Sequence, residues 1–137
     1  MQFNHFLIGA LIGLISPGVF AESNWKSIGT VDGFLIGIDT NSIKESIGYY
    51  PQTTHKVWSK HVVYEDLIQD GLTVGDYQMI LYLVNCETET YGIKSLTIYK
   101  KQKNGINNHE TVSAPYLKLE DAIPGTVGEG IVNITCH

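Results

Sequence analysis

The sequence predicts an α+β fold, in which a small antiparallel β-sheet of about six strands carries a C-terminal helix packed on one face. Short segments of alternating apolar residues, separated by turn residues, are typical of antiparallel strands. The last segment instead carries a helix-start signature. Two cysteines, Cys86 and Cys136, are placed so that a disulfide would tie this helix to the middle of the sheet.

Residues 1–21 are predicted to be an export signal peptide. An apolar run from Phe6 to Ile15 is broken by Ser16, Pro17 and Gly18, and small residues follow up to Ala21. The run is too short to cross a bilayer of roughly 30 Å, and no later stretch approaches about 18 consecutive apolar residues. We therefore expect cleavage after Ala21 to leave residues 22–137 as one exported domain without a transmembrane segment.

The first strands are predicted from a hairpin signal. Residues 25–31 are followed by Asp32 and Gly33, which favour a tight turn, and apolar residues then alternate from Phe34 to Ile38. Residues 39–42 have polar side chains that can form hydrogen bonds with their own backbone, so we expect the return strand to end there. A weaker segment over residues 43–50 is expected to be closed by Pro51.

The middle of the chain predicts the centre of the sheet. Residues 55–64 read as a strand, and residues 65–76, with four acids and two glycines, read as an exposed connection. Residues 77–86 are apolar on both faces, which predicts a central strand covered by the helix on one side and by a neighbouring segment or a second subunit on the other. Residues 91–99 are expected to pair with it, before a polar tip over residues 100–105 and a last strand near residues 110–114. In the central strand over residues 77–86, one face carries Ile80, Tyr82, Val84 and Cys86, and the other face carries Met79, Leu81 and Leu83.

The C-terminal segment is ambiguous in its periodicity, because it fits both a strand and a helical stripe. Thr126-x-x-Glu129 decides for a helix, since this is the capping-box form in which each side chain satisfies a backbone donor. Gly128 and Gly130 each cost a helix up to about 1 kcal/mol. We therefore expect the helix to depend on docking against the sheet.

The cysteine count favours a structural disulfide. An even number of cysteines in an exported chain predicts a bond between Cys86 and Cys136, the alternative being two free buried thiols. Closing a loop of this length would stabilise the fold by roughly 4 kcal/mol in the chain-entropy model.

Charge and motifs exclude several classes of function. Nine lysines, no arginine and fourteen acids give a net charge of −5, so nucleic acid is not expected as a partner. No nucleophile elbow is present. The acids Glu87 and Glu89 are interpreted as exposed strand-end residues rather than a glycosidase pair. The sequence therefore predicts no enzyme, no cofactor and no metal site. The histidines that lack metal-ligand spacing are His55, His61, His109 and His137.

Lys100, Lys101 and Lys103 form the one cluster of cations in the sequence. They are a candidate binding site for an acidic protein patch or a polyanionic surface. The alternative is a solubilising hairpin tip that protects a sheet edge. Aromatic residues are expected to pack on the sheet rather than to form a ligand platform. These aromatic residues are Tyr49, Tyr50, Trp58 and Tyr64.

A set of ordered landmarks spans nearly the whole predicted domain. It comprises Trp25, Asp39-x-x-Ser42-Ile43, Val57-Trp58, Cys86, Pro124-Gly125-Thr126-x-x-Glu129 and Cys136. With these landmarks the chain resembles the bacterial surface-adhesin protein E family. The resemblance implies a C-terminal helix held on the concave face of the sheet by the disulfide. For the namesake members of the family, it also implies dimerisation and binding of host proteins such as vitronectin, laminin and plasminogen.

Two functions follow as hypotheses. The first is an exported, non-enzymatic binding protein that engages host extracellular-matrix or serum proteins, as the resemblance implies. The second is a periplasmic structural or accessory protein of the cell envelope. The namesake of the family is a lipoprotein, whereas no cysteine stands at or just after Ala21 to accept a lipid anchor. Surface display by such an anchor is therefore not expected.

Overall fold

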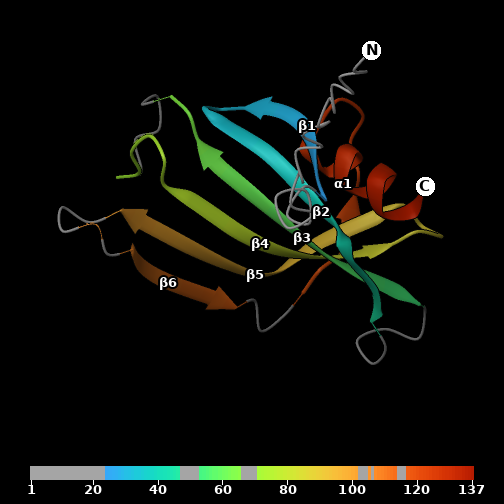
Figure 1. The fold of residues 1–137 in the computed structure, drawn as a ribbon. Helices are drawn as coiled ribbons and strands as arrows, with labels where there is room; N and C mark the ends of the chain where they lie inside the picture. Colours follow the sequence, from blue (N-terminus) through green and yellow to red (C-terminus); the bar gives the residue numbers. More distant parts are fainter. Residues whose placement is uncertain (1–23, 47–52, 66–70, 102–104, 106, 114–116) are drawn as a thin grey trace, which may run out of the picture.

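The computed structural model describes residues 24–46, 53–65, 71–101, 105, 107–113 and 117–137, and it shows one antiparallel sheet with a helix on one face (Figure 1). Neighbouring strands follow the order of the chain, and the short β7 pairs with β5 on the same side as β6. The predicted α+β class is confirmed, although β7 was not predicted. The elements are β1 (Trp25–Val31), β2 (Phe34–Ser46), β3 (Thr54–Val63), β4 (Tyr77–Asn85), β5 (Thr90–Lys101), β6 (Asn107–Ser113), β7 (Glu120–Asp121) and α1 (Val127–Cys136).

The turn between β1 and β2 is the predicted tight hairpin. Asp32 and Gly33 have φ angles of 49° and 82°, as a two-residue turn with both central residues in the left-handed region requires. Glycine adopts this conformation without steric cost, and aspartate is among the residues that tolerate it. The turn matches the right-handed twist of the two strands that it joins.

β2 does not end at residues 39–42, so that prediction was wrong. Asp39 Oδ1 accepts a bond from the Asn41 N–H at 3.0 Å, which is the expected local chemistry. The Ser42 hydroxyl, however, donates to the Asp39 carbonyl at 2.6 Å and accepts from the Trp58 N–H at 2.8 Å. The register shifts between Asp39 and Lys44, and pairing then resumes with β3. The polar residues therefore make a β-bulge within a continuous strand. Residues 47–50 and Pro51 lie outside the described residues.

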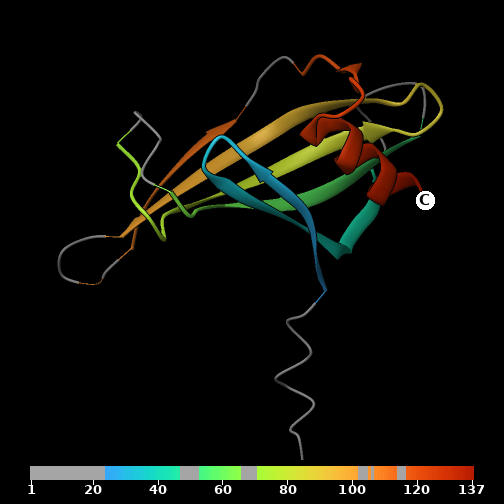
Figure 2. The same cartoon turned by 90° about the horizontal axis from the view of Figure 1, so that it is seen from above.

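The core lies between α1 and the middle strands. Ile80, Tyr82 and Val84 of β4 pack with α1, as the alternation along this strand predicted. Figure 2 shows the helix across one end of the sheet, where β4 finishes and β5 begins, so that the other end of this face is not covered by α1. The remaining members of the buried cluster are Ile38, Val57, Ile131 and Val132.

The opposite face is covered at the same end by residues 117–119. A Cβ added at Gly92 of β5 would lie 2.7 Å from the Lys118 carbonyl oxygen, so this segment packs directly on the strand. Its neighbour Tyr91 packs against Gly128 of α1. Because successive strand residues point to opposite faces, residues 117–119 lie on the face away from the helix. Leu83, which shares that face, is fully buried. A neighbouring segment therefore covers this part of the central strand, as predicted.

The connection before β4 is partly buried, which corrects the prediction of an exposed segment. Leu72 is buried, and Asp76 is only 3% exposed. Asp76 Oδ1 accepts the Lys101 N–H at 2.8 Å, and Oδ2 accepts the Thr73 N–H at 2.9 Å. The carboxylate thus ties the connection to the end of β5. Residues 66–70 lie outside the described part of the chain.

α1 begins where the sequence predicted, but its first turn is capped differently. Thr126 is the N-cap residue, yet its hydroxyl donates to the Ile123 carbonyl at 2.6 Å and makes no side-chain bond to the helix. Glu129 Oε2 accepts the Gly125 N–H at 2.6 Å instead of the N-cap N–H. The reciprocal capping box is therefore not formed, and the two side chains brace the preceding turn.

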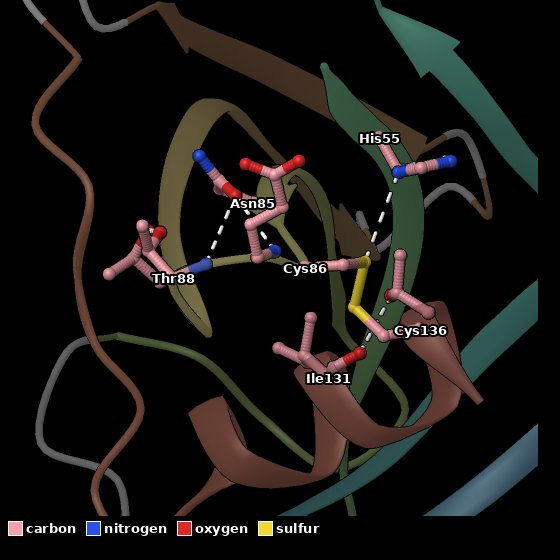
Figure 3. Close-up of a disulfide and its surroundings, with 9 residues drawn as sticks. His55, Asn85, Cys86, Thr88, Ile131 and Cys136 are labelled. Atoms are coloured by element: carbon pink, nitrogen blue, oxygen red, sulfur yellow. Dashed lines mark hydrogen bonds between the residues drawn. A yellow bond between two sulfur atoms is a disulfide. The ribbon is translucent and has the colours of Figure 1, made fainter. Parts of the chain in front are cut away.

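The predicted disulfide joins Cys86, directly after β4, to Cys136, the last residue of α1 (Figure 3). The Cα atoms are 5.6 Å apart. His55 of β3 lies beside the bond, with Nδ1 at 3.9 Å from Cys86 Sγ. Asn85 Oδ1 accepts the N–H groups of Glu87 and Thr88 at 3.0 and 3.2 Å, so the turn that carries Cys86 is held locally. The bond clamps the end of the helix onto the sheet.

Candidate functional site

We call one part of the sheet surface the open face. It is the face away from α1, without the part that residues 117–119 cover. The pairing register brings side chains from several strands into rows on this face. Its composition is aromatic and apolar at the centre. Members of the central rows are Leu35, Trp58, Val62, Tyr77, Met79 and Tyr99.

Four side chains on the open face form an aromatic ladder across β3, β4, β5 and β6. The rings of Tyr77 and Tyr99 stack at 4.7 Å with an interplanar angle of 15°. His109 continues the stack at 5.9 Å from Tyr99, and Lys60 Nζ lies 4.3 Å from the centre of the Tyr77 ring. Stacked rings and a cation over a ring face are each mutually attractive, so the ladder is held in place before any partner binds.

Two hollows flank the ladder. One, of about 290 Å³, is lined by side chains from β2 to β5 and has Trp58 and Met79 on its wall. The other, of about 200 Å³, lies toward β1 and is bordered by Trp25, Leu35 and Val62. Both are shallow depressions that suit a protruding side chain of a partner better than a deeply enclosed small molecule. The first hollow is lined by Asp39, Trp58, Met79, Thr97 and Tyr99.

The structure divides the lysine cluster that the sequence singled out. Lys100 and Lys101 are consecutive residues of β5, so their side chains lie on opposite faces. Lys100 is on the α1 side, where its charge acts on Asp76, and Lys101 is on the open face beyond Tyr99. Lys103 lies outside the described residues. Within the described part of the chain, the two lysines are therefore not a single patch.

His61 is the one buried histidine among the described residues. It lies on the α1 side of β3, is 8% exposed, and its Nε2 has no hydrogen-bond partner. Burial lowers the pKa of the imidazole to about 4, so the ring is neutral near pH 7. Burial, with a smaller effect of Tyr91, raises the pKa of Tyr82 in the core. Both pKa shifts are caused mainly by burial. His61 and Tyr82 are therefore interpreted as packed core residues and not as an acid–base pair.

The other predicted positions are separated in space. His55 lies beside the disulfide, His109 is in the aromatic ladder, and His137 is the C-cap residue of α1. Glu87 and Glu89 are exposed in the turn between β4 and β5. Three or more histidine, cysteine, aspartate or glutamate residues do not come together as a metal site anywhere in the described ranges.

Two of the four aromatic residues considered in the sequence lie among the described residues. Trp58 lines a hollow of the open face, and Tyr64 is exposed just after β3. Tyr49 and Tyr50 lie outside the described residues. Tyr77 and Tyr99 were not among the candidate residues predicted from the sequence. Their positions in two strands expected to pair were a signal for cross-strand contact, but only the register places one ring on the other.

Comparison with known proteins now identifies the family. The profile of the family described as surface-adhesin protein E matches residues 25–137, which is nearly the whole described chain. This chain belongs to the surface-adhesin protein E family. Membership in this adhesin family implies an exported or cell-surface protein that acts by binding rather than catalysis. Among proteins of curated function and among solved structures, none matches the chain.

Membership confirms the resemblance seen in the ordered landmarks, and it covers the sheet, the helix and both cysteines. The open face therefore belongs to an adhesin-like domain. None of the helices in the described ranges combines the length and apolar character needed to cross a bilayer.

Proposed function

We propose that this surface-adhesin protein E family member is an exported, non-enzymatic binding protein that holds a protein partner on the open face. The aromatic ladder and its two hollows carry the proposal, because they lie on a sheet face that α1 does not cover. Tyrosine, tryptophan and methionine are enriched at the centres of protein interfaces. The ladder is preorganised, which lowers the entropy lost when a partner binds.

Export is supported by the predicted signal peptide over residues 1–21, which precedes a domain over residues 22–137. The disulfide agrees with this location, since such bonds persist in oxidising compartments. Host matrix and serum proteins are the proposed partners. Vitronectin, laminin and plasminogen are the first to test, because the family resemblance implies them.

The test compares two open-face variants with one control variant, all in residues 22–137 with the disulfide formed. Trp58→Ala and Tyr99→Ala remove side chains from the open face, whereas Val112→Ala removes an exposed apolar side chain of β6 on the α1 side. Binding to each immobilised host protein is measured, and circular dichroism confirms that each variant is folded. We expect the open-face variants to lose about tenfold or more in affinity and Val112→Ala to bind normally.

Equal affinities in all folded variants would overturn the open face as the binding surface. Location provides a second test. Protease treatment of intact cells should cleave the protein if it reaches host partners. A protein that resists this treatment and is released by osmotic shock would instead be the periplasmic accessory protein of the second hypothesis.

A further inference from the structure

The open face carries a positive charge on a protein whose net charge is negative. By the register of β1 to β6, its charged side chains include four lysines and a single acid. The side chains are Lys44, Lys56, Lys60, Lys101 and Asp39. Asp121 of the short β7 points to the same side of the sheet, at the end that residues 117–119 cover. The whole chain, by contrast, has a net charge of −5. We propose that the partner segment seated on this face is an acidic polypeptide. The inference rests on the proposed function, which it deepens by naming the chemistry of the partner.

The described acids lie mostly elsewhere, so the two signs of charge are segregated. Glu45 and Glu110 occupy strand positions on the α1 side. Glu129 belongs to α1, and the exposed Glu87 and Glu89 lie in a turn. An approaching acidic segment would thus be attracted by the open face and repelled by the remaining surface. Such complementarity determines which partner binds and in which orientation.

One pair of lysines is unfavourable for the isolated domain. Lys44 and Lys56 are directly opposite each other on β2 and β3, just where pairing resumes after the β-bulge. Like charges at opposed positions of antiparallel strands repel and destabilise the sheet. A partner carboxylate between them would remove this repulsion. The pair therefore gives a reason for an anionic group of a partner to bind at this end of the open face.

The spacing along β3 defines the partner more closely. Lys56, Trp58 and Lys60 share one face, so the Cα atoms of the two lysines are about 13 Å apart along the strand, with Trp58 between them. An extended acidic segment with an apolar side chain between two carboxylates matches this order. The hollows beside Trp58 and Leu35 have apolar side chains on their walls and can receive apolar side chains of the partner. A polypeptide fits these requirements better than a sulfated polysaccharide, which offers anions without apolar side chains.

The experiment uses residues 22–137 and an immobilised random copolymer of glutamate and tyrosine as the probe. Lys56→Gln and Lys60→Gln each remove one lysine from the open face. Lys26→Gln is the matched control, because Lys26 is an exposed lysine of β1 on the α1 side and the change in net charge is the same. Dissociation constants are measured at 50 and 300 mM NaCl, with heparin as a second immobilised probe.

We expect each open-face variant to weaken copolymer binding two- to fivefold, the double variant about tenfold, and the control not at all. The double variant should also lose most of the dependence on salt, since fewer charges remain to be screened. Equal loss in the control, or no copolymer binding, would overturn the inference. Binding of heparin in preference to the copolymer would indicate a sulfated polysaccharide. Light scattering that shows self-association abolished by the same variants would indicate a second copy of this chain.

The host-protein assay separates this inference from the proposed function. If a host protein binds and Trp58→Ala weakens it, but Lys56→Gln and Lys60→Gln do not, only the acidic character of the partner is wrong. If Trp58→Ala has no effect on binding by the folded domain, the open face is not the binding surface, and the proposed function is wrong on this point.

Discussion

Gly128 of α1 lies directly against the ring of Tyr91 of β5. A Cβ at position 128 would overlap the phenol ring, so the absence of a side chain permits the helix to approach the sheet this closely. From the sequence, Gly128 counted only as a cost to helix stability. The structure shows that this cost accompanies a close contact at the start of α1, at the opposite end of the helix from the disulfide.

The two helix glycines should respond differently to alanine. Gly128→Ala is expected to destabilise the domain by about 1–3 kcal/mol, because the new methyl group overpacks against Tyr91. At Gly130 a Cβ would meet the end of the Ile28 side chain at 3.2 Å, which can shift slightly. Gly130→Ala should therefore be neutral or stabilise by up to about 1 kcal/mol through helix propensity. Urea unfolding measures both, and a larger loss for Gly130→Ala would contradict the packing described.

Loss of the disulfide should release α1. The bond closes a chain segment with a sequence separation of 50, so Cys86→Ser with Cys136→Ser is expected to cost about 4 kcal/mol. A ten-residue helix with two glycines is marginal without docking. Amide hydrogen exchange should therefore rise most in α1. Equal melting temperatures of the parent domain with and without reductant would count against this account.

His61 should make stability depend on pH in mildly acidic solution. The unfolded chain takes up a proton on this residue below its ordinary pKa of 6.5, whereas the folded protein does so only below about 4. The unfolded state thus binds more protons between these values, and stability falls as the pH is lowered through this window, by at most about 3 kcal/mol. His61→Leu should flatten this slope in urea unfolding series. His109→Gln, at an exposed position, retains His61 and should retain the slope.

Asp76 should stabilise the domain through its ionised form. Burial alone would raise the pKa of this carboxyl, but the Lys101 N–H, Thr73 and the nearby Lys100 charge together hold it below its ordinary value of 3.8. Its contribution is therefore present above that value and is lost as the pH falls through the lower, folded pKa. Asp76→Asn should cost about 1–3 kcal/mol at neutral pH, because an amide cannot accept all of these donors.

Asp39→Asn is the control for Asp76, since Asp39 accepts one local N–H at the bulge and an amide oxygen can do the same. Its effect should stay within about 0.5 kcal/mol. A chemical unfolding series at pH 7 compares the two variants. Similar small losses in both would show that the Asp76 carboxylate does not hold the connection to β5.

Local signals made much of the fold predictable. Asp32 and Gly33 marked the hairpin, the alternation around Ile80 identified the helix-covered face, and the cysteine count predicted the disulfide. The bulge in β2 was not predictable in this way. Side chains at residues 39–42 bond the local backbone whether a strand ends or bulges, and the deciding partner, the Trp58 N–H, lies 16 residues from Ser42.

The candidate site was less predictable because it depends on register. Counting back from the Asn85–Thr90 pair without interruption would place Tyr77 opposite Ile98, which points to the other face. A register shift between Leu81 and Tyr82 moves Tyr99 opposite Tyr77 and thereby creates the stack. Register also determines the positions of the lysines. Lys100 and Lys101 are adjacent in sequence but lie on opposite faces of the sheet. Lys44 and Lys56 are separated in sequence but lie opposite each other on neighbouring strands.

Met79 offers the most direct test of the open face as the binding surface. It lines the larger hollow, and it is the one methionine in residues 22–137, so labelling its methyl group with ¹³C gives a single resonance. The resonance is followed while the domain is titrated with whichever of vitronectin, laminin or plasminogen binds most tightly. The account predicts that the Met79 signal shifts or broadens in proportion to the bound fraction. An unchanged Met79 resonance at saturation would contradict it.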